Sequence, residues 1–210
     1  VYTASTEAYA PATKTAMDGL DVVWSEGDKI AVFSGYMFPD AYALTNGEGT
    51  KSAEFAFHDV AGYNTELEMD CNVAFYPYSD MVSYNDQGDG LTNVLFYAEQ
   101  IQTYTEGTFA NGAFPMVAVT DSPEDRTFNF KNVFGVLKLS LVGTKTVKSL
   151  KVNGNNSESL AGQCMVTMEN QVPSCMIDSY SALTSVTLDC GEGVELNVNE
   201  ATEFYIALPE

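Results

Sequence analysis

The sequence predicts an all-β fold, specifically an antiparallel β-sandwich with Greek-key connections. Apolar and polar residues alternate with a period of two in short runs, and Gly, Asn and Asp gather between these runs. No stretch of eleven or more residues shows the 3.6-residue period of an amphipathic helix, and only one helical turn is expected, near Asn132–Gly135. About a dozen short strands with turns between them are typical of a sandwich.

The predicted strands follow one another along almost the whole chain. In Ser185–Cys190 the apolar side chains share one face, and in Val136–Val142 three leucines alternate with polar residues. Trp24, the only tryptophan, is expected in the core because an apolar strand follows it closely. The predicted strands are Asp21–Trp24, Lys29–Phe33, Ser52–Phe57, Cys71–Tyr76, Val94–Tyr97, Phe114–Thr120, Thr127–Phe130, Val136–Val142, Val147–Val152, Ala161–Thr167, Ser185–Cys190 and Glu203–Leu208.

Residues 1–13 form an extended segment that precedes the single β-sandwich domain expected over residues 14–210. Tyr2, Ala4, Thr6 and Ala8 alternate along one side of this segment. Small residues in this alternation could pair along a sheet edge. The alternative is a loose terminus, which is the general expectation for the end of a chain.

The chain is strongly acidic, with 29 acidic and 9 basic residues and a formal net charge of −20. So few basic residues argue against a general nucleic-acid binder, and 45% hydrophobic residues argue against disorder. Six of the basic residues lie between Arg126 and Lys151, where no acidic residue occurs. Two neighbouring strands could carry these residues on their solvent face, or they could form a basic stripe that meets an acidic patch on another copy.

The four cysteines do not have the spacing of a zinc site, and His58 is the only histidine. Three interpretations stay open: a disulfide between Cys164 and Cys175 across a hairpin, a disulfide between Cys175 and Cys190, or small buried apolar side chains at all four positions, Cys71 included.

No motif in the chain indicates catalysis. Asn85–Gly90 resembles a calcium loop, but Phe96 stands where the bidentate Glu would fall, so an acidic turn is the better interpretation. Nucleophile, phosphate-loop and dinucleotide motifs are absent. We therefore predict no enzyme and no catalytic, cofactor-binding or metal-binding residues. The tyrosines at 76, 78 and 84 suggest a rival function, a cell-surface glycan-binding module, if they form a solvent-facing platform.

Several segments, taken in order along the chain, resemble the fimbrillin-like family, the stalk, tip and anchor subunits of Bacteroidetes surface fimbriae. The segments that carry this resemblance are Trp24–Phe33, Val73–Ser79, Glu99–Gln100, Phe114–Ala118, Phe128–Lys138, Val147–Gly154, Leu160–Gly162 and Phe204–Pro209.

The resemblance implies a transthyretin-like sandwich that forms the first domain of a structural or adhesive fimbrial subunit, made as a lipoprotein precursor. In this family an N-terminal strand is removed, and a strand of the next subunit fills the groove. Together with the alternation in residues 1–13, this implies that the segment pairs along the sandwich as a replaceable edge strand. The implied partners are other fimbrial subunits, in a homo- or heteropolymer, and a host protein or glycan, but no nucleic acid. The implied location is the cell surface, with outer-membrane attachment only through a removed lipoprotein signal.

The chain departs from the family pattern at both ends. The maturation cut in the family usually follows a basic residue, but Lys14 is the first basic residue here. The sequence also stops at Pro209–Glu210, where members of the family continue into a second domain.

Overall fold

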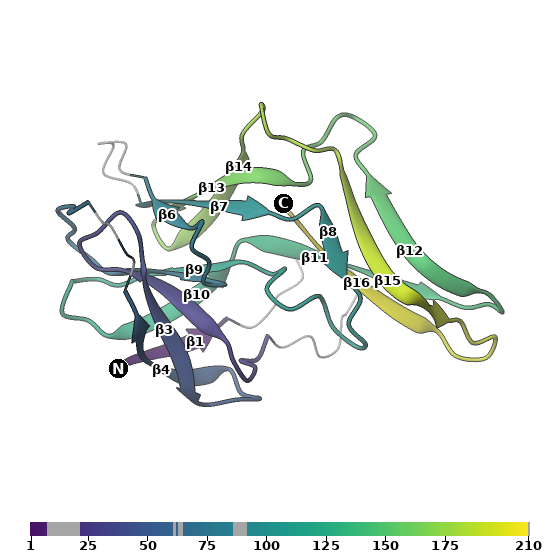
Figure 1. Ribbon diagram of the computed structural model, residues 1–210, viewed down its shortest axis with the longest axis horizontal. Helices are drawn as coiled ribbons and strands as arrows, with labels where there is room; N and C mark the ends of the chain where they lie inside the picture. Colours follow the sequence, from purple (N-terminus) through teal and green to yellow (C-terminus); the bar gives the residue numbers. More distant parts are fainter. Residues whose placement is uncertain (8–21, 61, 63–64, 86–91, 210) are drawn as a thin grey trace. The chain divides into compact units, whose positions relative to one another are not determined.

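A computed structural model describes the chain except for residues 8–21, 61, 63–64, 86–91 and 210. The described residues form β-strands and no helix, which confirms the all-β prediction (Figure 1). The strands are β1 Tyr2–Thr6, β2 Lys29–Phe33, β3 Asp40–Asn46, β4 Ser52–Asp59, β5 Val73–Tyr76, β6 Ser83–Tyr84, β7 Thr92–Ala98, β8 Ile101–Thr103, β9 Met116–Val119, β10 Thr127–Asn132, β11 Phe134–Leu141, β12 Thr146–Asn153, β13 Gly162–Glu169, β14 Val172–Ile177, β15 Ser185–Glu195 and β16 Thr202–Pro209.

The chain divides into two compact units, each with its own hydrophobic core, whereas the sequence led us to expect a single domain over residues 14–210. Unit 1 comprises Val1–Val94, Pro115–Asn132 and Thr167–Ser174. Unit 2 comprises Leu95–Phe114, Val133–Val166 and Cys175–Glu210.

Unit 1 is built on a sheet that closes on itself as a barrel, in the order β1-β10-β9-β5-β2-β3-β4; we call it the closed sheet. Strands β1, β4 and β10 alternate buried and more exposed residues, as the period-two pattern predicts, whereas β2, β5 and β9 are buried at consecutive positions. Closure gives every strand a hydrogen-bonded neighbour on both sides, so the closed sheet has no open edge.

Trp24 lies at the centre of the unit 1 core, which confirms the sequence prediction. Its ring is 1% exposed and meets Phe55, Tyr76 and Phe130 edge-on, with ring centroids 5.0, 5.5 and 5.5 Å away. Its indole N–H donates to the carbonyl of Lys51 at 3.2 Å, so the polar atom is satisfied inside the apolar core.

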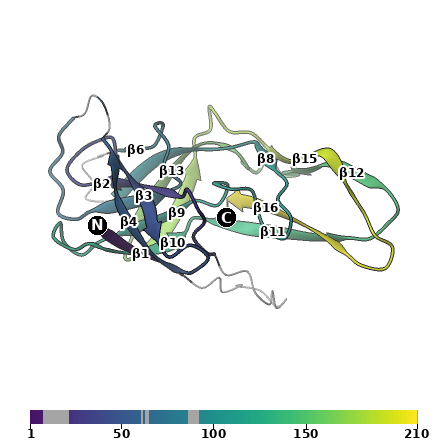
Figure 2. The same ribbon diagram turned by 60° about the horizontal axis from the view of Figure 1, so that its bottom comes forward.

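Unit 2 contains two small sheets, β11-β16 and β12-β15-β8 (Figure 2). β11 and β16 pair along their whole length, from Phe134 opposite Pro209 to Leu141 opposite Thr202. The buried amide of Gln102 fastens β8 to β16. It donates to the carbonyl of Ala207 at 2.7 Å and accepts from the same residue's N–H at 3.0 Å.

A further sheet has the order β14-β13-β7-β6, and its strands β7, β13 and β14 contribute residues to both units. Asn170 and Gln171 connect β13 to β14 with positive φ values of 51° and 62°. Two such residues in succession form the type I′ turn that matches the twist of a hairpin.

Some details differ from the sequence prediction. The helical turn near Asn132–Gly135 is wrong, because β10 ends at Asn132 and the extended strand β11 begins at Phe134. No strand covers residues 22–24, and Asp21 lies outside the described residues. The strands β3, β6, β8 and β14 were not predicted. Two pairs, β1 with β10 and β8 with β15, are parallel rather than antiparallel.

Candidate functional site

The candidate site is the position of β1 in the closed sheet, between β4 and β10; we call it the β1 slot (Figure 1). β1 runs antiparallel to β4, with Tyr2 opposite Phe55, and parallel to β10, with Ala4 opposite Phe128. The prediction that the segment pairs with the sheet is confirmed for residues 2–6. Its predicted place at an edge is wrong, because β1 has a hydrogen-bonded neighbour on each side.

The inward face of β1 carries the alternation seen in the sequence. Tyr2, Ala4 and Thr6 are 2%, 3% and 8% exposed, while Thr3 and Ser5 point away from the core. The rest of the predicted segment, residues 8–13, lies outside the described residues. β1 is therefore an integral part of the unit 1 core rather than a strand laid on its surface.

Tyr2 is the anchor of the strand. Its ring stacks on Phe128 with centroids 4.8 Å apart and meets the Tyr42 ring edge-on at 5.0 Å. The guanidinium of Arg126 lies 4.9 Å from the ring centroid and donates a hydrogen bond to the Tyr2 hydroxyl. Burial raises the pKa of Tyr2, and the positive charge of Arg126 opposes that rise.

Polar side chains on both faces of β1 also fasten the strand. The Ser5 hydroxyl donates to the side-chain oxygen of Asn129 at 2.9 Å, and the Thr6 hydroxyl donates to the carbonyl of Val22 at 2.7 Å. Directly after β1, the Glu7 carboxylate accepts from the backbone N–H of Asn132 at 2.7 Å and from the ammonium of Lys131 at 3.1 Å.

Three features of the β1 slot can therefore contribute to binding an extended segment. It offers main-chain groups on two flanking strands, an aromatic pocket for one large side chain, and a cation beside that pocket. Sequence analysis identified the alternation within β1 but not the residues that contact Tyr2 and hold the strand in place, which are Tyr42, Arg126 and Phe128. These residues are far from β1 in the sequence, and no local pattern links them to it.

The tyrosines of the suggested glycan platform have mixed environments. Tyr76 is 8% exposed and its hydroxyl donates to the buried carboxylate of Asp28 at 2.9 Å. Tyr78 and Tyr84 are half-buried, and the Tyr78 hydroxyl donates to Asp80 at 2.8 Å. Burial and the neighbouring Asp80 raise the pKa of Tyr78 to about 12. These three residues do not form one solvent-facing platform.

Tyr78 does line a cavity of about 350 Å³ in unit 1. Phe38 and Pro39 supply apolar walls, and Asp59 and Asp80 supply carboxylates. An aromatic ring beside carboxylates is a combination that can hold a sugar ring and its hydroxyl groups.

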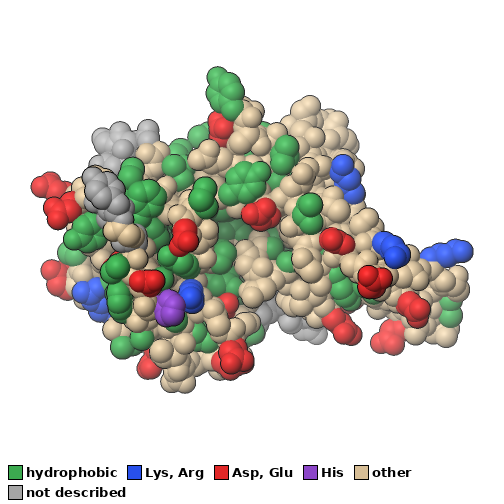
Figure 3. Space-filling model, in the orientation of Figure 1, with side chains coloured by type: hydrophobic (Ala, Val, Ile, Leu, Met, Phe, Trp, Pro, Cys, Tyr) green, Lys and Arg blue, Asp and Glu red, His purple; other side chains and the backbone are tan. Residues whose placement is uncertain are grey.

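The six basic residues between Arg126 and Lys151 are distributed over different sheets. Lys131 lies on β10 with Arg126 directly before it, Lys138 lies on β11, and Lys148 and Lys151 lie on β12 with Lys145 directly before it. They do not occupy two neighbouring strands, which corrects that interpretation. On the face seen in Figure 3, basic side chains are interspersed with acidic ones.

Other sequence candidates can be placed only in part. Residues 86–90 of the calcium-like loop lie outside the described residues. Among the residues that the structure does describe, no group of three or more His, Cys, Asp or Glu side chains is arranged to hold a metal ion. In the structure, Cys71, Cys164, Cys175 and Cys190 form no disulfide.

Over the same described part of the chain, no helix is long and apolar enough to cross a membrane. In comparisons with known proteins, no protein-family model and no curated sequence matches the chain.

Proposed function

We propose that the protein is a structural or adhesive subunit of a bacterial surface fimbria that assembles by strand exchange at the β1 slot. The observation that carries this proposal is the position of the short strand β1 between two others in the closed sheet. The resemblance to fimbrillin-like proteins gives the biological setting: a subunit at the cell surface whose partners are other fimbrial subunits.

The β1 slot suits exchange because withdrawal of β1 would leave two open edges. The edges of β4 and β10 would then expose main-chain N–H and C=O groups, and the places of Tyr2, Ala4 and Thr6 would be empty. A strand from another subunit could form hydrogen bonds with these main-chain groups and fill the empty places with its own alternate side chains.

The strength of β1 docking also bears on how exchange would proceed. Backbone hydrogen bonds contribute about 1 kcal/mol each, and a buried ring contributes about 1.5–3 kcal/mol more. A strand held in this way stays in place until the chain is cut, so proteolysis between β1 and Val22 is the step that would free the slot.

The test compares the intact chain with a chain cut after Lys14, using Lys14→Gln as an uncut control. Hydrogen exchange should show protected amides at residues 3–6 before the cut. After the cut, a fluorescent peptide of residues 1–14 should exchange into the β1 slot. The cut chain, mixed with a full-length fimbrial subunit, should also form a complex that elutes earlier in size-exclusion chromatography.

Unprotected amides across residues 3–6 would contradict the docked strand. Failure of the cut chain to take up either the peptide or the second subunit would contradict strand exchange. A complex that forms equally well with the Lys14→Gln control would show that assembly uses another surface.

A second candidate function, a cell-surface glycan-binding module, is favoured by the cavity beside Tyr78. Tyr78→Ala should then abolish binding on a glycan array, whereas Tyr180→Ala, at a residue that is 99% exposed, serves as the matched control. Equal binding by the two variants would remove the cavity from consideration.

A further inference from the structure

Cys164 and Cys175 belong to the same hairpin, formed by β13 and β14. The two-residue turn at Asn170–Gln171 implies a register in which Val166 faces Cys175 across the two strands. The hydrogen bond from the Ser174 hydroxyl to the carbonyl of Thr167, at 3.5 Å, agrees with this register. Cys164 is therefore the diagonal neighbour of Cys175.

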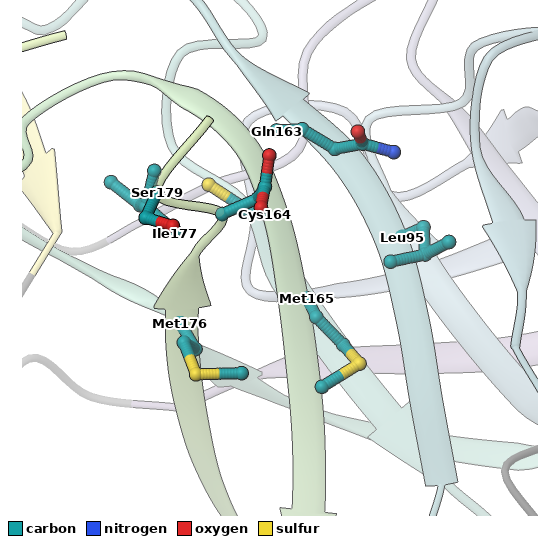
Figure 4. A pocket seen from close by; sticks show the side chains of 8 residues that line it. Leu95, Gln163, Cys164, Met165, Met176, Ile177 and Ser179 are labelled. Carbon is teal, nitrogen blue, oxygen red and sulfur yellow. The ribbon is translucent and has the colours of Figure 1, made fainter. Parts of the chain in front are cut away.

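Both cysteines point to the same side of the hairpin. On β13 the buried residues alternate, and Cys164 is one of them. On β14, Cys175 belongs to the half-buried set, while Met176 next to it is exposed. Met165 and Met176 lie on the other side of the hairpin (Figure 4).

The two thiols are close enough to act on each other's ionisation: the pKa of Cys164 is lowered by Cys175 and by the backbone of Ala98, and the pKa of Cys175 is raised by Cys164. The Cys164 thiol in turn faces the carbonyl of Gly162 at 3.5 Å. Each thiol shifts the pKa of the other, downward for Cys164 and upward for Cys175, so the pair releases one proton while it retains the other.

We propose that Cys164 and Cys175 are a dithiol site that small disulfides oxidise to an intramolecular disulfide. Cys175, half-buried on edge strand β14, is more exposed than the buried Cys164, so it is the cysteine that an external disulfide meets first. A cavity of about 470 Å³ lies at this hairpin, with Leu95, Met165 and Met176 among its lining residues, but Cys175 does not line it (Figure 4).

The reaction balances as two thiol–disulfide exchanges. In the first, the Cys175 thiol loses its proton and attacks oxidised glutathione, which gives a mixed disulfide and one reduced glutathione. In the second, the Cys164 thiolate attacks the Cys175 sulfur of the mixed disulfide. The S–S bond between the two cysteines forms, and a second glutathione leaves and takes up a proton.

The disulfide would fix β14, the edge strand of its sheet, to its only neighbour β13. β14 carries Pro173, which cannot donate a main-chain hydrogen bond, so it is a weakly held strand. The proposal concerns only this hairpin and does not depend on the proposed role in a fimbria.

The test uses the unaltered 210-residue chain in buffers that range from fully reduced to fully oxidised glutathione. Thiols are then blocked, and the protein is digested without reduction for peptide mapping by mass spectrometry. We expect the four titratable thiols to fall to two and the mass to fall by two hydrogens. The map should contain one cross-linked peptide pair, joining Cys164 to Cys175.

Matched variants identify the pair independently. Cys71→Ser and Cys190→Ser should still lose two thiols on oxidation. Cys175→Ser should form no internal disulfide on oxidation. Cys164→Ser should stop at a stable mixed disulfide between Cys175 and glutathione. A cross-link between Cys175 and Cys190, or four thiols that persist in fully oxidised glutathione, would overturn the proposal.

Discussion

The two units have cores of different kinds. The unit 1 core is aromatic and sealed: its rings, among them Trp24, Phe55 and Phe130, are nearly inaccessible to solvent. The unit 2 core is aliphatic, and most of its leucines, such as Leu137 and Leu139, are only partly buried. Closure of the sheet in unit 1 explains this difference, since a sheet without edges leaves no side from which water can enter the core.

This comparison bears on the β1 slot. The sealed core of unit 1 includes Tyr2 and Ala4 from the short strand β1. A side chain of β1 is therefore expected to affect that core as strongly as one from the other strands of the closed sheet. The predictions below test this difference between the units.

Trp24→Ala should have the largest effect on stability, since it removes the central ring of the sealed core. Large aromatic truncations of this kind cost about 3–5 kcal/mol of unfolding free energy. Leu139→Ala in unit 2 should cost much less, because that side chain is already partly in water. Denaturant unfolding followed by circular dichroism measures both, and equal losses would contradict the contrast between the cores.

Tyr2→Ala should come next, at about 2–4 kcal/mol, because it removes a buried ring and leaves a cavity beside Phe128. The loss should be concentrated in the strand, so that hydrogen-exchange protection at residues 3–6 disappears first. Tyr2→Phe is the matched control. It keeps the ring and loses only the bond from Arg126, so most of the protection should remain.

The positions of the strands could be predicted from the sequence more accurately than their pairing into sheets. β2 was placed at its observed bounds because a turn and an apolar run mark it locally. β14 was missed because Pro173 interrupts its pattern, and Asp21–Trp24 was taken for a strand although Trp24 enters the core from a loop.

The candidate site shows the same limit. The alternation of Tyr2, Ala4 and Thr6 identified a strand, but whether that strand lies at an edge depends on partners far away in the sequence. A disulfide between Cys164 and Cys175 was one of three open interpretations, since the turn that sets the register of the hairpin could not be recognised from Asn170–Gln171 alone.

The buried carboxyl of Asp28 should give unit 1 a measurable pH dependence. Burial raises its pKa, although the Tyr76 hydroxyl and the Ser25 N–H both oppose that rise. A carboxyl whose folded pKa is raised binds its proton more tightly in the folded state. Stability is therefore lost as pH rises from the ordinary Asp value through the raised folded value.

Asp28→Asn should remove this part of the pH dependence, because the amide cannot ionise and can still accept from Ser25. The effect should be smaller than either truncation. It is measured as the difference between wild-type and variant unfolding free energies from pH 3 to pH 7, a range of about four units around the ordinary Asp pKa. Tyr76→Phe should enlarge the dependence, and identical profiles for wild type and Asp28→Asn would contradict the argument.

The smallest effect is expected from Glu7→Gln, which tests whether charge or geometry holds the end of β1. Glutamine keeps an oxygen that accepts from the N–H of Asn132, but it loses the ion pair with Lys131. The side chains of both Glu7 and Lys131 are about one-third exposed. Exposed pairs contribute about 0.2–1 kcal/mol and are screened by salt. The loss of protection at residues 3–6 should therefore be slight at low salt and vanish near 1 M salt. Lys138→Gln, which breaks the ion pair with Glu203 in unit 2, is the matched control and should leave the protection of β1 unchanged at every salt concentration. A loss in Glu7→Gln that persists at high salt would show that the hydrogen bond to Asn132, rather than the charge, fastens the strand.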